Sequence, residues 1–519
     1  MAPLPPKPDT PLVDNEPDRF FSTERLRTDL RGHTVRGGAV MAVSQGLRFA
    51  LTLGGMMILG RLLTPEEYGL VGMVMAITGL VLTFKDLGVS MAAIQRARIT
   101  HVQMTNLFWF NVAVALGAAA ITFGMAPLIA TFYGDHRLVA VTQVLSLGFV
   151  ISGFASLHQA LLRRQMRFRR LAMVDLSASA ISLLVAVIAA RLGASYWALV
   201  LQCITFPVAA ALTAWLLCDW RPGLPKRGGD TFSLLAMGSN TAAGTLLGYI
   251  SVNFDKVVLG RYCGAADLGN YGRGFNLVKL PMSQVNPPLS AIMIPALSQL
   301  ADRPEQYRRA FLRVYRPVNM LIMPLTAYMI ASSDWLILAV LGPRWVGAAP
   351  ILALLGLCGL ATPLACMIPW LLLSQDRSNH LLLFCLIGTM TRVVAVAIGL
   401  HWGVLGVAAA FSVESVLVQI PLLLWLAQKR GPVRAGHLVR SLGAPVAASA
   451  LILVLTTALR LWHPVDSSYA LLALATAVSA GVFAATVLAS PGEREVLRDL
   501  RAMLLQRNEA PSRREASGA

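Results

Sequence analysis

Six basic residues lie inside apolar stretches of this sequence, where they are the side chains best able to do chemistry. They are Arg48, Lys85, Arg273, Lys279, Arg316 and Arg392. Four acids share these stretches: Asp86, Asp175, Asp255 and Glu414. A charge at the centre of a bilayer costs about 2.5 to 3.5 kcal/mol on insertion scales. We therefore expect these side chains to face protein or a wet cavity.

Binding of an anion is the chemistry that these bases favour. All except Arg392 belong to apolar runs near 39–94 and 266–340, so a cavity between those runs would carry positive potential. Arginine also presents a planar fork of N–H donors that matches phosphate. We expect a group such as diphosphate to bind there. The candidate cavity cations are Arg48, Arg273 and Lys279, which we prefer as headgroup ligands, together with Lys85 and Arg316.

Ion pairing explains part of the set better than ligand binding does. Lys85 directly precedes an aspartate, and Arg392 and Glu414 fall on adjacent predicted helices, so structural pairs are favoured for both. Asp255 and Lys256 lie where a predicted helix leaves the membrane. Snorkelling toward water and a functional role explain that pair equally well.

Membrane helices are the elements that must position these side chains. Of the 519 residues, 56% are hydrophobic and 13% are charged, against about 25% charged residues in soluble domains. A spanning helix needs roughly 20 mostly apolar residues, because its amides find no water in the hydrocarbon. We predict fourteen spans, of which 311–340 is expected to bend or split at Pro317 and Pro324. They lie near 39–60, 68–94, 103–131, 138–161, 171–190, 194–217, 231–255, 266–298, 311–340, 347–373, 380–400, 402–427, 438–459 and 468–489.

The loops between these runs predict the orientation. The net charge of +18 would suggest a nucleic-acid partner in a soluble protein. Here the bases concentrate in alternate loops instead, as expected for loops on the cytoplasmic side. Both termini are therefore predicted to be cytoplasmic, and no nucleic-acid partner is expected. No outer loop exceeds about a dozen residues, which leaves no room for a folded catalytic domain outside.

The six cysteines show no paired-ligand spacing, and the N-terminal segment has no short apolar stretch followed by a cleavage site. We expect no metal, no cofactor, no disulfide framework and no removable signal peptide.

An internal repeat appears when the chain is shifted by 200 residues. The shift places Leu59, Gly60, Arg61, Gly69 and Gly72 over Leu259, Gly260, Arg261, Gly269 and Gly272. Six predicted spans separate the copies, so both enter the membrane in the same direction. Two facing six-helix bundles follow, a layout that suits alternating access to a central cavity.

The predicted fold is all-α: a polytopic membrane protein with about 14 transmembrane helices, in two pseudo-symmetric six-helix lobes plus two C-terminal helices. The C-terminal amphipathic segment would lie on anionic lipid or against the protein itself. The predicted domains are a cytoplasmic tail at 1–38, an N-terminal lobe at 39–217, a cytoplasmic linker at 218–230, a C-terminal lobe at 231–428, two additional helices at 429–489, and a cytoplasmic amphipathic helix and tail at 490–519.

Three stretches of the sequence resemble a known family. They are GRLLTPEEYGLVGMV, TGLVLTFKDLGVSMAAIQR and NFDKVVLGRYCGAADLGNYGRGFNLVKLP. They look like the polysaccharide or O-antigen flippases, the lipopolysaccharide and exopolysaccharide biosynthesis transporters of the multidrug/oligosaccharidyl-lipid/polysaccharide exporter superfamily. The resemblance covers roughly residues 30 to 430. By this likeness the family motif falls on Gly60, Arg61, Pro65, Tyr68 and Gly69, and on Asp255, Lys256, Gly260, Leu268, Gly269 and Tyr271.

The resemblance implies a cationic, V-shaped cavity that moves undecaprenyl-diphosphate-linked oligosaccharide repeat units to the periplasmic leaflet of the bacterial inner membrane. Expected partners are anionic lipids, a polysaccharide polymerase and chain-length or export proteins. Three alternatives stay open. A membrane-embedded polymerase or glycosyltransferase would want acids at an outer helix end. A drug/cation antiporter would want a cavity dominated by carboxylates. A lipid II flippase can be separated only by genomic context or rescue of a depleted strain.

Overall fold

The computed structural model describes residues 30–85, 99–225, 248–428, 431–462 and 467–490, together with Arg494. Within these ranges the chain forms helices joined by short turns, without a strand. This confirms the all-α prediction. The first tail residues, Asp86 and the predicted amphipathic segment, Arg494 excepted, lie outside the described residues.

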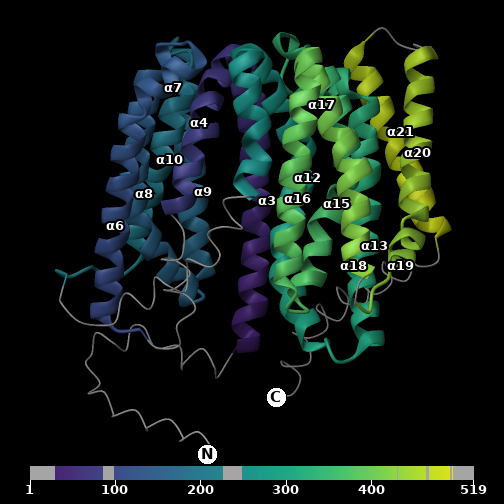
Figure 1. The fold of residues 1–519 in the computed structure, drawn as a ribbon, viewed down its shortest axis with the longest axis horizontal. Helices are drawn as coiled ribbons and strands as arrows, with labels where there is room; N and C mark the ends of the chain where they lie inside the picture. Colours follow the sequence, from purple (N-terminus) through teal and green to yellow (C-terminus); the bar gives the residue numbers. More distant parts are fainter. Residues whose placement is uncertain are drawn as a thin grey trace, which may run out of the picture. The chain divides into compact units, whose positions relative to one another are not determined.

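Helices of the structure coincide, wholly or in part, with all fourteen predicted runs. The first half contains α3 (Leu30–Leu62), α4 (Pro65–Lys85), α6 (His101–Gly124), α7 (Ala126–Tyr133), α8 (Arg137–Arg164), α9 (Phe168–Arg191) and α10 (Trp197–Leu217). The second half contains a helix at 248–262, α12 (Ala265–Gln299), α13 (Pro304–Ala331), α14 (Ser333–Val340), η1 (Pro343–Trp345), α15 (Ala348–Leu373), α16 (Ser378–Gly399), η2 (Leu400–Trp402), α17 (Gly403–Glu414), the π-helical turn η3 (Ser415–Gln419) and α18 (Ile420–Gln428). It ends with α19 (Ala435–Ser441), α20 (Gly443–Trp462) and α21 (Ser468–Ala489), and Figure 1 labels most of these helices.

Length and hydropathy identify membrane spans among the described helices. Nine are long and apolar enough to cross a bilayer, or ten if the bent pair α13 and α14 is one span. One of the nine is the 50-residue apolar run Ser378–Ala427, which turns at η2, where Gly403 takes a φ of +68°. The chain is therefore a multi-pass membrane protein, while the count of fourteen spans stays a prediction.

Local sequence signals start two of these helices. At the start of α4, the side chain of Glu67 accepts a hydrogen bond from the backbone N–H of Thr64 at 2.6 Å. At the start of α6, the hydroxyl of Thr100 accepts from the N–H of Gln103, whose side chain accepts from the N–H of Thr100. Both are reciprocal caps that satisfy N–H groups left free by the first turn of a helix.

The run 311–340 is split, as predicted, but not at Pro317 or Pro324. The helix α13 continues through both prolines to Ala331, and the chain turns by 88° between α13 and α14. Neighbouring groups can satisfy the amides that a proline frees in a membrane helix. At the turn, the carbonyl of Tyr328 accepts from the hydroxyl of Ser332 at 2.6 Å and from its backbone N–H at 3.0 Å.

The described chain divides into two compact units whose boundaries differ from the predicted lobes. The first unit contains Met1–Gly55 and Ile77–Leu246, and the second contains Met56–Ala76 and Leu247–Ala519. The second unit therefore includes a short hairpin from the first copy of the repeat. We call Met56–Ala76 the exchanged hairpin.

Aromatic side chains fill the core of the first unit at one end of α6, α8 and α10. The ring of His158 stacks on Trp215 at 4.5 Å between centroids, and Phe108 meets both rings edge-on. The indole N–H of Trp215 donates to the carbonyl of Phe154 at 3.0 Å. These contacts tie three helices together through buried area and directed bonds.

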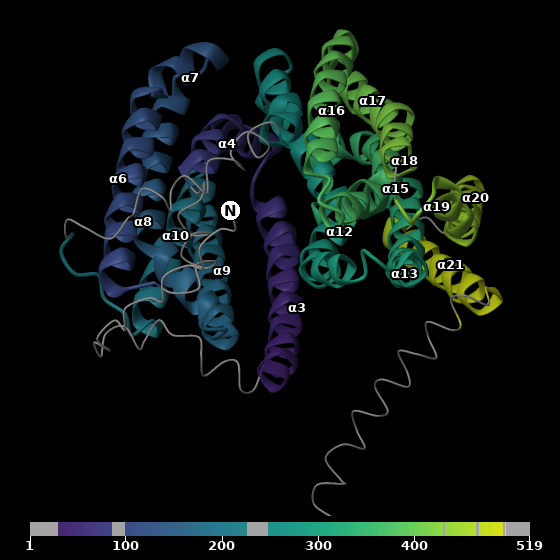
Figure 2. The same cartoon turned by 60° about the horizontal axis from the view of Figure 1, so that its bottom comes forward.

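In the second unit, the two C-terminal helices α20 and α21 pack against α13 (Figures 1 and 2). Ala327 of α13, Ile452 of α20 and Val482 of α21 form one buried cluster. The guanidinium of Arg460 pairs with Asp334 of α14. These helices are thus part of the second unit rather than a separate body.

The two copies of the repeat meet at a pair of glycines. A Cβ atom at Gly69 would overlap the carbonyl oxygen of Ala265, and one at Gly269 would overlap that of Pro65. The contact is reciprocal. Gly69 lies against Ala265 and Gly269 lies against Pro65, and Pro65 and Ala265 are themselves aligned in the repeat. It confirms the predicted alignment at this point and explains why both positions must lack a side chain.

Candidate functional site

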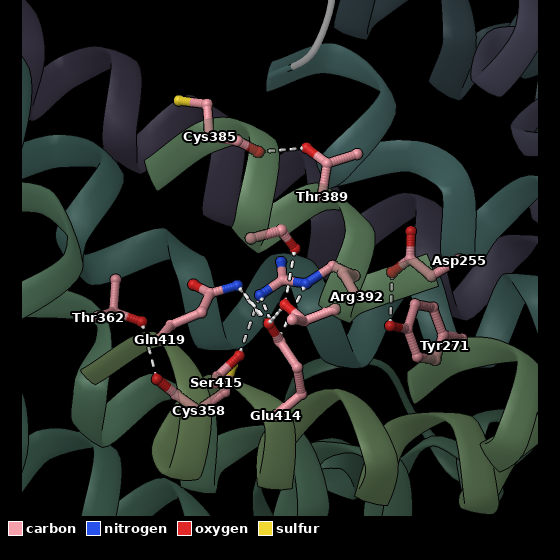
Figure 3. A network of polar contacts seen from close by, with 12 residues as sticks. Asp255, Tyr271, Cys358, Thr362, Cys385, Thr389, Arg392, Glu414, Ser415 and Gln419 are labelled. Atoms are coloured by element: carbon pink, nitrogen blue, oxygen red, sulfur yellow. Dashed lines mark hydrogen bonds and ion pairs between the residues drawn. The ribbon is translucent and has the colours of Figure 1, made fainter. Parts of the chain in front are cut away.

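A buried ion pair joins α16 to α17. The guanidinium of Arg392 donates to Oε2 of Glu414, with Nη2 at 2.9 Å and Nε at 3.2 Å, and both side chains are less than 10% exposed (Figure 3). Nη2 also donates to the hydroxyl of Ser415 at 3.1 Å. The predicted Arg392–Glu414 pair is therefore confirmed.

Further donors complete the surroundings of the Glu414 carboxylate. The hydroxyl of Thr391 donates to Oε1 at 2.8 Å, and the amide of Gln419 donates to both oxygens at 3.0 and 3.1 Å. Gln419 follows Glu414 by five residues and ends the π-helical turn η3, whose wider spacing directs that amide back to the carboxylate. A buried charge with all its bonds made is a structural unit rather than an open binding site.

A second buried carboxylate lies beside this network. Asp255 is fully buried, and its Oδ2 accepts a hydrogen bond from the hydroxyl of Tyr271 at 2.6 Å (Figure 3). Its Oδ1 accepts from the backbone N–H of Lys256 at 2.9 Å. The side chain of Asp255 is 0% exposed, so it does not reach toward water as a snorkelling side chain would. A role in the protein interior therefore explains Asp255 better than snorkelling does.

Two lysines share one aromatic ring in the second unit. The ring of Phe275 stacks on Tyr271 at 5.8 Å, and the ammonium of Lys279 lies 4.0 Å from the Phe275 centroid. The ammonium of Lys256 lies 5.6 Å from the same centroid and donates to the side-chain oxygen of Asn253 at 2.8 Å. Among the described residues, neither ammonium has a carboxylate within 4.0 Å. We call Lys256, Phe275 and Lys279 the lysine pair site.

The remaining predicted cavity cations lie in different surroundings. Arg48 belongs to the first unit and pairs with Asp175 at 3.5 Å, with 46% and 32% of the two side chains exposed. Arg316 is an exposed residue of α13. The predicted pair of Lys85 with Asp86 lies outside the described side chains. A cavity shared by all five predicted cations stays a prediction.

Arg273 contacts an aromatic ring that could not be predicted from its position in the sequence. Its guanidinium carbon lies 3.7 Å from the ring centroid of Tyr68, in the exchanged hairpin. The ring of Tyr68 in turn meets Trp345 edge-on at 5.3 Å. The positive guanidinium is attracted to the negative face of this ring, so the contact holds Arg273 against the exchanged hairpin. The structure thus adds Trp345 and Phe275 as supporting residues of the cationic groups, and it gives the predicted motif residue Tyr68 a cationic partner.

The family motif residues are mostly packing and bonding positions at the ends of the helices. Gly60 is buried against Leu341, and its carbonyl accepts a hydrogen bond from the indole of Trp345 at 2.7 Å. Arg61 donates to the carbonyl of Ala339 at 2.9 Å. Gly260 and Leu268 are buried in the second copy. Within the described chain, no group of three His, Cys, Asp or Glu side chains is suited to hold a metal ion.

Solved structures show which class of fold these helices form. A structure of "Lipid II flippase MurJ, inward closed conformation" matches with a TM-score of 0.70 and 14% identity, covering 87% of this chain and 98% of that one. The inward-facing structure of a multidrug resistance MATE family transporter of the MOP superfamily matches with a TM-score of 0.59 and 15% identity, covering 76% and 96%. The fold is that of a polytopic helical transporter.

Sequence comparison then gives the family. The family model described as polysaccharide biosynthesis protein matches residues 58–350, more than half of the chain. "Lipopolysaccharide biosynthesis protein WzxC" of Escherichia coli is 27% identical over 75% of this chain and 79% of its own length. "Succinoglycan biosynthesis transport protein ExoT" of Rhizobium meliloti is 24% identical over 62% and 66%. This chain belongs to the polysaccharide biosynthesis protein family, which confirms the resemblance noted in the sequence.

Proposed function

We propose that this protein is a flippase that moves undecaprenyl-diphosphate-linked oligosaccharide repeat units across the inner membrane for exopolysaccharide or lipopolysaccharide biosynthesis. It works by alternating access through a cationic cavity and is not an enzyme. Membership of the polysaccharide biosynthesis family and the transporter fold support the proposal. So do relatives named for lipopolysaccharide biosynthesis and for succinoglycan transport.

The lysine pair site is the observation that supports an anionic cargo. Two ammonium groups on one phenyl ring, with no carboxylate in ion-pair distance among the described side chains, keep their charge available. In surroundings of low dielectric this charge attracts an anion more strongly than at a wet surface. A diphosphate matches two neighbouring cations in charge. The carboxylate of Glu414 is paired with Arg392, so its charge is largely balanced and does not offset this potential as an open acid would.

The cellular setting is part of the same proposal. Both termini lie in the cytoplasm, and the loaded lipid enters from the cytoplasmic leaflet. Its partners are anionic lipids, the polymerase that consumes the repeat unit and the chain-length or export proteins. The distribution of basic loops supports this orientation.

Flipping of lipid II is the second candidate, and the likeness to the lipid II flippase fold favours it. Both cargoes present a diphosphate to the lysine pair site, so the site does not separate them. Deletion of the gene separates them. The proposal expects a lipid-linked oligosaccharide other than lipid II to accumulate on the cytoplasmic leaflet. Accumulation of lipid II, with rescue of a lipid II flippase-depleted strain, would support the second candidate instead.

The lysine pair site is tested by Lys279→Met, which we expect to reduce polymer export about tenfold or more, because it removes a desolvated charge–phosphate contact. Lys279→Arg keeps the charge and should retain most export. The matched control is Arg308→Gln, which removes a partly exposed cation paired with Glu305 at 3.1 Å. Normal export by a Lys279→Met, Lys256→Met double variant that inserts normally would exclude this site.

A further inference from the structure

The end of α3 is bonded to the turn between α14 and α15 by three side chains. The indole of Trp345 donates to the carbonyl of Gly60 at 2.7 Å, and Arg344 donates to that of Leu62 at 3.3 Å. Arg61 donates in the other direction, to the carbonyl of Ala339 at 2.9 Å. The last carbonyls of a helix have no partner within the helix. These bonds therefore fix the end of α3 to a segment far away in the sequence.

Trp345 is the central member of this set. Its side chain is fully buried, so its indole N–H has no water to exchange for the Gly60 carbonyl. The same ring meets Tyr68 edge-on, and Tyr68 carries the guanidinium of Arg273 on its face. One continuous series of contacts thus runs from a cation, Arg273, to the end of α3.

The exchanged hairpin connects this series of contacts to movement within the protein. Its residues pack in the second unit, yet the chain enters it at Gly55 and leaves it at Ile77, both of which belong to the first unit. A transporter that changes access must alter the packing of such a segment or carry it along. The bonds of Gly60, Arg61 and Leu62 decide which of the two happens.

We propose that Gly60, Arg61, Leu62, Arg344 and Trp345 form a latch that holds the end of α3 against the end of α14 and the turn that follows it, and that a phosphate group binding Arg273 releases it. Trp345 is the positioning residue. The release follows because a phosphate competes with the Tyr68 ring for the guanidinium, and Tyr68 then loses the cation that holds it beside Trp345. This inference rests on the proposed function, since it assigns the trigger to the phosphate of the same cargo.

Accessibility of a cysteine at Leu63, a side chain that is 2% exposed, reports the state of the latch. The full chain, with its six native cysteines replaced, carries Leu63→Cys and is treated in spheroplasts with a maleimide that cannot cross the membrane. Trp345→Phe keeps the ring but removes the N–H donor. We expect it to raise the labelling rate about tenfold, the effect of one lost buried hydrogen bond on an opening equilibrium. Arg61→Gln, at an exposed side chain, should raise it about threefold.

The matched control is Trp215→Phe, which removes a similar indole bond, to Phe154 at 3.0 Å, within the first unit. It should leave the labelling rate unchanged. Equal rates for Trp345→Phe and the parent protein, or an equal increase in Trp215→Phe, would overturn the latch.

The trigger is tested by adding inorganic diphosphate to the parent protein in proteoliposomes. We expect faster labelling of the cysteine at position 63, and no such change in Arg273→Gln. Labelling that ignores diphosphate, or that responds equally in Arg273→Gln, would overturn the release. These labelling experiments contain no sugar, so their result does not depend on which cargo is exported. An error in the proposed cargo would appear only in the gene deletion.

Discussion

At matching positions of the two copies of the repeat, Gly55 and Met56 in the first correspond to Asp255 and Lys256 in the second. Gly55 packs against the side chain of Leu183, whereas Asp255 accepts a buried hydrogen bond from Tyr271. The reciprocal glycine contact is nevertheless shared by both copies. The two copies thus share the backbone contact at the crossing, whereas at these two aligned positions only the second copy carries charged side chains.

The same asymmetry holds for the cations. Arg273 and Lys279 correspond to Met73 and Gly79, while Arg48 corresponds to Gly248. Each cation therefore faces its surroundings without a symmetric twin. A site for an asymmetric cargo, with a charged headgroup at one end and sugars at the other, needs such a difference between two otherwise similar halves.

The largest expected effect compares the ion pairs of the two units. Arg392→Met leaves Glu414 buried and unpaired, which should cost about 3 to 5 kcal/mol of stability. Arg48→Met breaks the half-exposed pair with Asp175 and should cost less than about 1 kcal/mol. Thermal unfolding followed by tryptophan fluorescence measures both. Similar losses of stability in the two variants would mean that solvent screens both ion pairs equally. That result would contradict the difference in burial between them.

A smaller effect tests the symmetry of the glycine crossing. Gly69→Ala and Gly269→Ala each place a Cβ atom against a backbone carbonyl, so each should cost about 1 to 3 kcal/mol. Gly272→Ala is the matched control, because no atom lies within 4 Å of its added Cβ. The apparent melting temperature of the purified variants is the measurement. If one of the first two variants behaved like Gly272→Ala, the contact would not be reciprocal.

The smallest effect concerns a polar cluster of the first unit outside its spans. Hydrogen bonds from Arg167 and Arg170, at 3.1 and 3.2 Å, hold the pKa of Asp219 below its ordinary value of 3.8. A carboxyl with a lowered folded-state pKa stabilises the protein above its unfolded pKa, and this is lost as the pH falls through the lowered value. Because Asp219 is exposed, Asp219→Asn should cost less than about 1 kcal/mol at pH 7. The difference in melting temperature from the parent protein should shrink as the pH falls through the lowered pKa, and a difference that did not change with pH would exclude the charge as its cause.

Much of the fold follows from the sequence because the bilayer imposes simple demands. Apolar runs became helices, and the aligned glycines of the repeat proved to touch. The position of the bend at Ser332 did not follow, because Pro317 and Pro324 are stronger helix breakers in water than in a membrane helix.

The contacts of the site were predictable where the pairing of opposite charges determines them. Arg392 and Glu414 had to find each other, because neither could stay buried alone. Trp345 and Phe275 could not be found in this way, since an indole or phenyl ring in an apolar run carries no sign of the carbonyl or cation that it will meet. Tyr68 was visible as a motif residue, but its partner Arg273 is distant in sequence.

The exchanged hairpin has a consequence for how the protein can move. Its two ends, Gly55 and Ile77, fall in the interiors of α3 and α4 rather than in loops. Within the described residues, the chain therefore passes from the first unit into the exchanged hairpin and back through two continuous helices, with adjacent glycines, Gly54 and Gly55, at one boundary. Glycine pairs are places where helices bend. Any displacement of the exchanged hairpin from the rest of α3 and α4 therefore requires these helices to bend, since no loop lies at either end of it.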